Sequence, residues 1–423
     1  MKILHTVEFY HPSVGGMQEV VKQISERLAR LGHDVTVATG KLPERKEKVI
    51  NGVKIAGFRI SGNAVRGFAG KTYKYTEFLL DSDFDVITNF AAQQWATDLA
   101  LPILERLKAK KVFVPTGFSG LYWPEYQDYF RSMKTWLAKY DCNVFLSNDY
   151  RDINFARENG IANLTVIPNG AGADEFLAPA ATNIREVLDI PKEHFLLLHV
   201  GSHTGSKGHA EAARIFEHAK ITETTFLLVG NSFGGGCTES CEAAEASFNQ
   251  SALRVKDGKR LMVRNLTRQE TVAAFRQADL FLFPSSIECS PLVLFECMAA
   301  KTPFLSSDAG NSAEIIEWCK SGKLLSTVKE PGGSSRVRVR DAVKLLEELY
   351  YHPAEREQMA AAGFEAWQKR FTWEKISSDY EKLYLSLVEQ TAMASVKQAQ
   401  GGNFYARDYS PHPPCWRRQS ISV

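Results

Sequence analysis

Short apolar runs and amphipathic segments alternate along most of this chain. Residues 111–115, 196–200 and 280–283 form apolar runs bounded by turn residues, a pattern typical of strands in a parallel sheet that is covered on both faces. Between such runs, apolar residues recur at helical spacing, first across residues 20–31, where Gly32 then ends the pattern. This alternation predicts an α/β protein with parallel sheets.

The same pattern predicts the remaining strands and divides the chain. Further strands are expected at residues 2–7, 34–38, 86–88, 144–147, 165–167, 225–230, 261–264 and 303–306. A length of 423 residues suggests two or three domains, and we expect a second sheet to begin at residues 196–200. The periodicity ends near residue 390, so we expect a disordered tail from there.

The overall composition excludes several classes of function. A net charge of +2 argues against a nucleic-acid-binding protein, and the longest apolar runs are far too short to span a membrane. The first residues carry no signal-peptide features, so we expect a cytoplasmic protein. The seven cysteines are odd in number and scattered, which predicts no disulfide framework.

Two stretches of the sequence contain residue types that can bind metal ions. Cys237 and Cys241 could face the same way on a helix, but two thiols do not complete a zinc site and no matching His/Cys pair follows them. Residues 81–85 contain two overlapping D-x-D triplets, yet they precede the strand at residues 86–88 and so lie at the edge of the sheet opposite to ligand sites. We therefore expect no metal and no cofactor.

The stretch around which the chain is organised runs from residue 278 to residue 316. After the strand at residues 280–283 comes a polar loop, and Ser290-Pro291 is expected to open a helix, with the serine as N-cap and the proline at the first helical position. A second strand follows, and Glu314 is expected to begin another helix. The sequence thus predicts a helix N-terminus at the carboxyl edge of a parallel sheet, where ligands of such sheets bind.

The chemistry of this stretch suits a nucleotide sugar. A helix N-terminus offers free N–H groups and about half a positive charge, which would hold a diphosphate. Glu288 stands just before the expected helix. Glu296 lies six residues into the helix from Ser290, about 9 Å along its axis, where a carboxylate could hold sugar hydroxyls. The spacing alone leaves a second interpretation open, in which both acids are merely solvated on a buried β-α-β crossover.

Glu288 and Glu296 also form an E-x7-E pattern, after ADLFLFPSS and before GNSAEII, and this stretch resembles the retaining GT-B glycosyltransferases of glycosyltransferase family 4. The resemblance, which extends with gaps over roughly residues 1–387, implies two Rossmann-like doubly wound domains facing each other across a cleft. It implies that Glu288 faces the donor sugar and Glu296 the ribose. The phosphates would lie on the backbone between them, at Ser290, Pro291, Leu292 and Val293, with Pro291 unable to donate.

The resemblance also implies how the chain is divided. Residues 1–172 would form the acceptor-side domain, residues 173–372 the nucleotide-sugar-binding domain, and residues 373–389 a helix that returns to the first domain. Residues 390–423 would be the disordered tail. The turn Pro168-Asn169-Gly170 resembles the family's crossing point between the domains.

Other loops match the family in part. Gly15-Gly16, after the first strand, is expected to approach the donor phosphates, and Lys207 matches the lysine of the G-R-x-x-x-x-K-G phosphate loop. The arginine of that loop is replaced by Ser202. Candidate replacements for the missing cation are His203, His209 and Arg264. Val263 and Arg264 are expected to hold the nucleotide base by backbone contacts.

Two further features bear on the sugar and the acceptor. Many members carry a histidine where this chain has Thr116, which would move a histidine role to His5 or His11. The aromatic residues between 118 and 140 recur at three and four residues, so they share a helix face. That face either docks an acceptor glycan or a membrane edge, or packs beneath the cleft, and we favour packing.

The resemblance implies a retaining, metal-independent hexosyltransferase that moves a sugar from a nucleotide-diphosphate donor to a hydroxyl of a glycan, lipid or small molecule, in cell-surface polysaccharide or glycoconjugate synthesis. Glu288 and Lys207 are the expected catalytic residues. The alternatives are a GT-B nucleotide-sugar epimerase and a non-catalytic nucleotide-sugar-binding or scaffold protein. The base, the sugar, the acceptor, the oligomeric state and any peripheral contact with the inner face of a membrane stay open, and so does whether Ser202 and Thr116 redirect activity.

Overall fold

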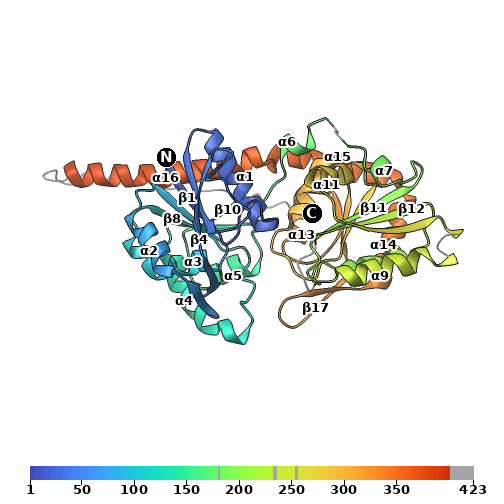
Figure 1. Cartoon of the computed structure of the whole chain (residues 1–423), viewed down its shortest axis with the longest axis horizontal. Helices are drawn as coiled ribbons and strands as arrows, with labels where there is room; N and C mark the ends of the chain where they lie inside the picture. Colours follow the sequence, from blue (N-terminus) through green and yellow to red (C-terminus); the bar gives the residue numbers. More distant parts are fainter. Residues whose placement is uncertain (180–181, 232–235, 253–255, 401–423) are drawn as a thin grey trace, which may run out of the picture.

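The structure, a computed structural model, describes residues 1–179, 182–231, 236–252 and 256–400, with side chains described up to residue 390. Two sheets dominate it, and each is the centre of one lobe (Figure 1). The parallel pairing of nearly all strands agrees with the predicted α/β class and with two Rossmann-like units.

The first sheet has the strand order β10-β9-β8-β7-β1-β2-β4-β3 and is parallel except for the β3–β4 pair. Its strands are β1 (Lys2–Thr6), β2 (Asp34–Gly40), β3 (Val49–Ile50), β4 (Val53–Phe58), β7 (Val86–Phe90), β8 (Lys110–Val114), β9 (Cys142–Phe145) and β10 (Leu164–Val166). A separate hairpin pairs β5 (Ile60–Asn63) with β6 (Gly67–Gly70). The helices of this part are α1 (Gly16–Arg30), α2 (Thr72–Asp81), α3 (Trp95–Asp98), α4 (Gln127–Lys139) and α5 (Arg151–Glu158), with 3-10 turns η1 (Leu101–Arg106) and η2 (Pro124–Tyr126).

The second sheet has the order β13-β12-β11-β14-β15-β16 and is parallel throughout. Its strands are β11 (Phe195–Val200), β12 (Thr224–Val229), β13 (Lys259–Arg264), β14 (Leu280–Phe283), β15 (Phe304–Ser307) and β16 (Gly322–Leu325). A small hairpin pairs β17 (Thr327–Lys329) with β18 (Ser335–Val337). The helices are α6 (Ala173–Phe176), α7 (Ile184–Val187), α8 (His209–His218), α9 (Thr238–Asn249), α11 (Arg268–Gln277), α12 (Leu292–Ala300), α13 (Ser312–Cys319), α14 (Val339–Tyr351) and α15 (Pro353–Arg370).

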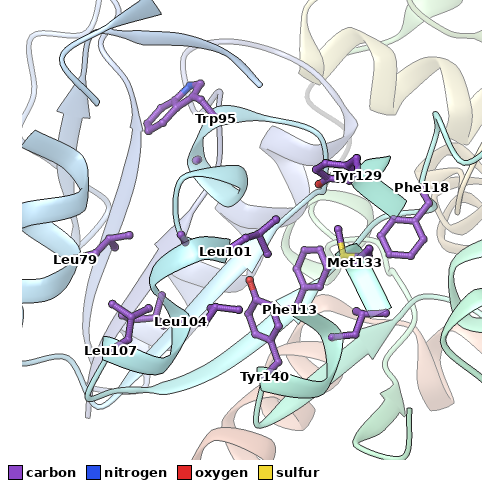
Figure 2. Packing of buried hydrophobic residues seen from close by; sticks show 14 of the residues in the cluster. Leu79, Trp95, Leu101, Leu104, Leu107, Phe113, Phe118, Tyr129, Met133 and Tyr140 are labelled. Atoms are coloured by element: carbon purple, nitrogen blue, oxygen red, sulfur yellow. The ribbon is translucent and has the colours of Figure 1, made fainter. Parts of the chain in front are cut away.

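Apolar residues cover both faces of each sheet, as the continuous apolar strands predicted. On the first sheet, one buried cluster lies under α2 to α5 and another under α1 and the C-terminal helix. Figure 2 shows residues of the former, among them Trp95, Phe113 and Tyr140, and Tyr129 and Met133 of α4. The aromatic face of α4 belongs to this core, since Tyr129 and Met133 are buried. The packing interpretation of that face is thereby confirmed, although Tyr122 before the helix is exposed.

The last helix of the described chain, α16, runs from Trp373 to Gln400 and lies along the first lobe (Figure 1). Its buried residues Trp373, Ile376, Tyr380 and Tyr384 pack into the core under α1. The expected tail from residue 390 was placed too early, because seven of the ten residues 391–400 are Ala, Met, Lys or Gln, which favour helix, and the next glycines come at residues 401 and 402. The rest of the expected tail, residues 401–423, lies outside the described residues.

The chain crosses between the two lobes at two adjacent places. Ala171 forms a parallel bridge with Thr372, its N–H donates to the carbonyl of Phe371 at 3.0 Å, and its carbonyl accepts from Trp373 N at 3.2 Å. Trp367 Nε1 donates to the same carbonyl of Ala171 at 3.1 Å. The two chain crossings, at Ala171 and at Thr372, are therefore hydrogen-bonded to each other and form one short connection between the lobes.

Candidate functional site

The loops after β11 and β14 bring Lys207 and Glu288 into contact. These strands are neighbours in a parallel sheet, so their carboxyl ends meet at one edge. Lys207 Nζ lies 2.7 Å from Glu288 Oε1, and Ser285 Oγ donates to the same oxygen at 2.7 Å. The Glu288 side chain is only 9% exposed, so its carboxylate is held firmly at this edge. The two expected catalytic residues therefore lie together, with a serine that the sequence interpretation had not included.

The helix that follows begins one position later than predicted. Pro291 has an extended ψ of 117° and is the N-cap of α12, so Leu292 is the first helical residue. The fixed φ of proline suits the cap as well as the first turn, which explains the offset. The Ser290 hydroxyl is buried and has no hydrogen-bond partner in the described part of the chain, so it does not cap the helix. Leu292 and Val293 supply the first-turn N–H groups, which lack intrahelical acceptors.

Residues of the first lobe reach this edge. The Tyr150 hydroxyl donates to the carbonyl of Glu288, and Asn169 Nδ2 donates to the carbonyl of Ser290 at 3.0 Å. On the neighbouring loop, Glu314 accepts from Asn148 N at 3.0 Å and from Asn148 Nδ2 at 2.7 Å. The sequence interpretation treated Glu314 only as the start of a helix; α13 begins two residues earlier, at Ser312, and nothing in the sequence indicated that Glu314 bonds to the first lobe.

Glu296 has different partners from Glu288. It is buried inside α12, and its Oε1 lies 2.6 Å from Nη1 of Arg268, which also pairs with Glu175 at 2.8 Å. Burial raises the pKa of Glu296, and Arg268 opposes that shift. The negative charges of Glu175 and of Glu19, in the first turn of α1, raise the same pKa. The proposed ribose contact would therefore share this carboxylate with Arg268.

The glycine loop lies before α1, with Gly15 as its N-cap. A Cβ on Gly16 would meet no atom within 4 Å, whereas one on Gly15 would fall 2.5 Å from Oε1 of Gln18. Gly16 therefore leaves open space beside the backbone, which is what a close approach of a ligand needs.

The expected base-binding residues are engaged by the inserted helix α9. Glu245 of that helix accepts from Val263 N at 3.0 Å and pairs with Arg264 Nη1 at 2.9 Å. Arg264 Nη1 also donates to the carbonyl of Val263 at 2.6 Å. The Val263 backbone groups and the Arg264 side chain are thus occupied, so a base at this point would have to displace Glu245 or use other atoms.

The phosphate loop carries Ser202 in place of a cation, and the three suggested replacements have other partners. Arg264 is paired with Glu245. The Nδ1 atoms of His203 and His209 lie 3.5 Å and 3.6 Å from Cys237 Sγ. Ligand atoms of His203, Cys237 and Cys241 fall within 4.8 Å of one another. The sequence analysis considered only ligands that follow Cys241, whereas these two histidines precede both cysteines in the sequence.

The loop at Thr116 takes an unusual backbone path next to Glu288. Thr116, Gly117 and Phe118 all have positive φ values, of 60°, 97° and 47°. Buried Asp152 accepts from Gly117 N at 2.8 Å, and burial raises the pKa of Asp152 to about 6. A Cβ on Gly117 would lie 2.9 Å from Cys289 Sγ, so the loop packs directly against the residue after Glu288.

The two histidines suggested in place of Thr116 lie in different surroundings. His5 is fully buried, with Nδ1 at 2.7 Å from Ser25 Oγ and Nε2 at 3.1 Å from the Tyr384 hydroxyl. Burial lowers the pKa of His5 to about 3, so it stays neutral. His11 lies in an exposed loop after β1. The role proposed for His5 is therefore wrong, because His5 packs between the first sheet and α16.

The rejected D-x-D stretch behaves as a turn. Asp81 ends α2, Asp83 pairs with the side chain of Lys2, and Asp85 accepts from Lys2 N at 2.7 Å. These acids lie at the amino end of β7, away from the carboxyl edge that carries the candidate site. The interpretation as a turn is confirmed.

A cavity of about 450 Å³ opens on the first lobe. It lies at the carboxyl ends of β1, β2 and β4, where Glu8, Lys41 and Arg59 line it together with Phe58 and Trp95. Two cations and one carboxylate at the ligand edge of a parallel sheet make it a candidate for binding a polar, charged molecule.

Among the described residues, no helix combines the length and the apolar character that crossing a bilayer requires.

Comparison with known proteins gives two family matches. The family model described as Glycosyltransferase Family 4 matches residues 14–175, and the model described as Glycosyl transferases group 1 matches residues 180–363. The chain is 24% identical over 396 residues to N-acetyl-alpha-D-glucosaminyl L-malate synthase of Bacillus anthracis, covering 89% of this chain and 96% of the relative. It is 21% identical over 245 residues to lipopolysaccharide 1,2-N-acetylglucosaminetransferase of Salmonella typhimurium, covering 57% of this chain and 61% of that protein.

Solved structures resemble the whole fold. Sucrose-phosphate synthase from Thermosynechococcus elongatus superposes with a TM-score of 0.73 at 18% identity, covering 92% of this chain and all of that one. Anabaena Alr3699/HepE in complex with UDP-glucose gives a TM-score of 0.68 at 16% identity, covering 91% of this chain and all of that one. At these identities the similarity establishes the arrangement of two facing α/β domains.

Proposed function

We propose a reaction for this chain from the premise that it belongs to glycosyltransferase family 4, has the GT-B fold and is a glycosyltransferase that uses a nucleotide-sugar donor. The reaction is the metal-independent transfer of the donor sugar to a hydroxyl, with retention at the anomeric carbon. The observation that carries the proposal is the contact of Lys207 with Glu288 beside the N-terminus of α12.

Negative charge develops on the departing diphosphate as the bond from the anomeric carbon to the phosphate oxygen breaks. In the proposed reaction, Lys207 exchanges Glu288 for this diphosphate. The first-turn amides of Leu292 and Val293 and the dipole of α12 add further stabilisation. Stabilisation of this kind acts without a metal ion at the phosphates.

The sugar carries positive charge in the same step. Glu288, released by Lys207 but still held by Ser285, is proposed to bind and orient the sugar hydroxyls. The acceptor oxygen attacks the face that the phosphate leaves, so configuration is retained, and its proton passes to the departing phosphate oxygen. No protein base is needed. The donor contacts proposed for Gly15, Gly16, Ser202 and Glu296 complete the site.

We place the acceptor at the cavity on the first lobe. Lys41 and Arg59 have no ion pair among those found in the described residues, so they favour an acceptor with an anionic group near its hydroxyl. One relative is named as an L-malate synthase and another as a lipopolysaccharide transferase, so the relatives' acceptors range from a small acid to a glycolipid. We also propose a cytoplasmic enzyme of glycoconjugate or surface-polysaccharide synthesis that reaches membrane-bound acceptors from the inner face.

The deciding experiment offers UDP-, GDP- and ADP-sugars to the enzyme with a panel of acceptors that includes L-malate. Product configuration is read by NMR, and rates are compared without added divalent metal and with Mg²⁺ or Mn²⁺. We expect one nucleotide to be released, a product with the donor's configuration, and the same rate in all buffers. An inverted product would refute retention, and activity only with added metal would refute metal independence. Isomerised donor without an acceptor would instead identify an epimerase.

A further inference from the structure

Two histidines of the phosphate loop and two cysteines of an inserted helix converge at one place. His203 lies in the loop after β11, His209 opens α8, Cys237 is the N-cap of α9 and Cys241 lies one turn later. We propose that these four side chains bind a zinc ion, which ties α9 to the phosphate loop. This site is independent of the proposed transfer reaction.

The distances fit tetrahedral coordination. Zinc binds cysteine sulfur at about 2.3 Å and histidine nitrogen at about 2.05 Å, so a tetrahedral angle sets the two ligand atoms about 3.6 Å apart. Cys237 Sγ lies 3.5 Å from His203 Nδ1 and 3.6 Å from His209 Nδ1. Cys241 completes a set of three groups whose ligand atoms all fall within 4.8 Å of one another. His209, whose ring stacks on that of His203 with centroids 4.3 Å apart, lies outside that set of three and is the proposed fourth ligand through its approach to Cys237.

The surroundings orient the ligands. His209 Nε2 lies 3.1 Å from the carbonyl of Gly201, and a proton there leaves Nδ1 free to bind metal. A backbone carbonyl in that position is a common outer partner of a zinc-bound histidine. Cys237 and Cys241 lie on the same side of their helix, as the hydrogen bond from Cys241 N to the Cys237 carbonyl at 3.0 Å requires.

The backbone makes room for this cluster. A Cβ on Gly236 would fall 1.5 Å from the carbonyl oxygen of His203, and one on Gly230 would fall 2.9 Å from its Cδ2. Only glycine permits these approaches. His203, His209 and Cys241 are each more than nine-tenths buried and Cys237 is half-buried, so four protein ligands would leave little room for a water ligand. A closed Cys2His2 set is typical of structural zinc.

A zinc ion at this place would fix the position of helix α9. Helix α9 carries Glu245, which holds Val263 and Arg264, and His209 follows Lys207 by two residues. A zinc ion would therefore connect the element at the expected base site to the loop at the expected phosphate site. It would stabilise that arrangement and take no part in the chemical step.

The test measures metal directly. The reduced full-length protein is incubated with Zn²⁺ alone, desalted and analysed for zinc, and a second sample receives Co²⁺ alone. We expect about one zinc per chain, and visible absorption bands of tetrahedral cobalt with a sulfur-to-metal band. C237S and C241S should lose most of the zinc and the sulfur band, and H209A should weaken binding. C319A, which removes a buried cysteine distant in sequence from the cluster, serves as the control and should keep about one zinc.

Two outcomes would overturn the proposal. Absence of zinc and of cobalt bands from the folded, reduced wild-type protein would do so, and this result does not depend on whether any variant folds. Equal zinc loss in C319A and C237S would also do so, since binding would then follow general stability. Formation of a Cys237–Cys241 disulfide with no zinc bound would assign the pair to thiol oxidation instead.

Discussion

Lys207 and Glu288 form an ion pair that must open for the proposed reaction. Lys207 is 27% exposed and the Glu288 side chain only 9%, so loss of the lysine leaves a largely buried carboxylate that keeps its hydrogen bond from Ser285. The cation of Lys207 is placed to meet a departing diphosphate. We expect Lys207→Met to lower kcat/KM about 10²- to 10³-fold, as loss of one charge-stabilising donor does. The melting temperature should also fall, so the kinetics are compared at a temperature at which both proteins are folded. Steady-state kinetics with the preferred donor test this, with Lys344→Met on the exposed face of α14 as the control.

Ser285 is a positioning residue for Glu288. It is fully buried and donates to the carboxylate oxygen that also faces Lys207, so it holds Glu288 when the lysine moves away. A hydrogen bond to a charged group is worth roughly 1.5–3 kcal/mol, so we expect Ser285→Ala to lower kcat about 10-fold or more with little change in acceptor KM. The matched control is Ser286→Ala, because both serine hydroxyls lie within hydrogen-bond distance of the Ser206 carbonyl, at 3.1 Å and 3.0 Å, and only that of Ser285 also reaches Glu288. Equal kcat values for the two variants would contradict this role.

Arg59 tests the acceptor site. If the cavity holds an anionic acceptor, Arg59→Gln should raise the acceptor KM about 10-fold and leave donor binding unchanged, since a charge-assisted hydrogen bond is lost. Arg66→Gln, at the exposed turn between β5 and β6, should leave both constants unchanged. A larger effect of Arg59→Gln on the donor than on the acceptor would place the cavity on the donor side.

Some site residues could be predicted from the sequence and others could not. Lys207 and Glu288 occupy loops at the carboxyl ends of two strands, and the strand pattern alone brings such loops to one edge. Tyr150 and Glu314 depend on how two lobes face each other, because their partners lie 138 and 166 residues away. No local periodicity contains that information. The histidines near Cys237 could not be found from local patterns either, because they lie 34 and 28 residues away from it in the sequence.

At the scale of elements, positions of strands were predictable and ends of helices were less so. Four apolar residues, Leu280 to Phe283, form β14 as expected because burial on both faces demands a continuous apolar strand. Helix α12 starts one residue later than predicted, because proline suits both the N-cap and the first helical position. Helix α16 ends at Gln400 and not at residue 389 as predicted. Most of residues 391–400 favour helix, but they show no apolar periodicity from which a helix could be predicted.

The attachment of α16 to the first lobe should weaken in acid. His5 bonds to Tyr384 of α16, and its pKa is about 3 in the folded protein compared with about 6.5 when unfolded. Below about pH 6.5 the unfolded chain binds a proton that the folded chain excludes, so the free energy of unfolding falls with falling pH. The loss is about 2 kcal/mol between about pH 7 and about pH 5.

His5→Gln removes the titrating group but keeps an amide between Ser25 and Tyr384. We expect its urea midpoint to fall less than that of the wild-type protein over the same pH interval, with fluorescence or circular dichroism as the measurement. The paired comparison cancels groups common to both proteins, such as Asp152, whose raised pKa has the opposite effect on stability. Identical pH dependence in the two proteins would exclude His5 as the source.

At the scale of the whole molecule, two kinds of contact set how the lobes face each other. One is the connection at Ala171 and Thr372, where both chain crossings are hydrogen-bonded together. The other is the group of bonds beside Glu288, which joins loops after β9 to the helix starts of the second lobe. The two-domain architecture was predictable from the alternation of strands and helices. The bonds that hold the lobes closed were not, since they join residues that only the closed arrangement brings together.

Glu314 is the most heavily bonded of these contacts, and it provides a test of closure. Its carboxylate accepts from Asn148 N at 3.0 Å, from Asn148 Nδ2 at 2.7 Å and from the Ser147 hydroxyl. Glu314→Ala leaves those donors to water and removes the bridge, so the open arrangement of the lobes gains population. We expect a larger radius of gyration by small-angle X-ray scattering and about 10-fold weaker donor binding, because only part of the population presents a complete site.

Glu317→Ala is the matched control, because Glu317 is exposed on the same helix, α13, and changes the net charge equally. It should leave both the radius of gyration and the donor affinity as in the wild-type protein. Saturating donor should restore the wild-type radius in Glu314→Ala, since the ligand favours the closed form. A variant that binds donor weakly but scatters like the wild-type protein would show that Glu314 acts locally on the donor loop, and the bridge would then have no part in closure.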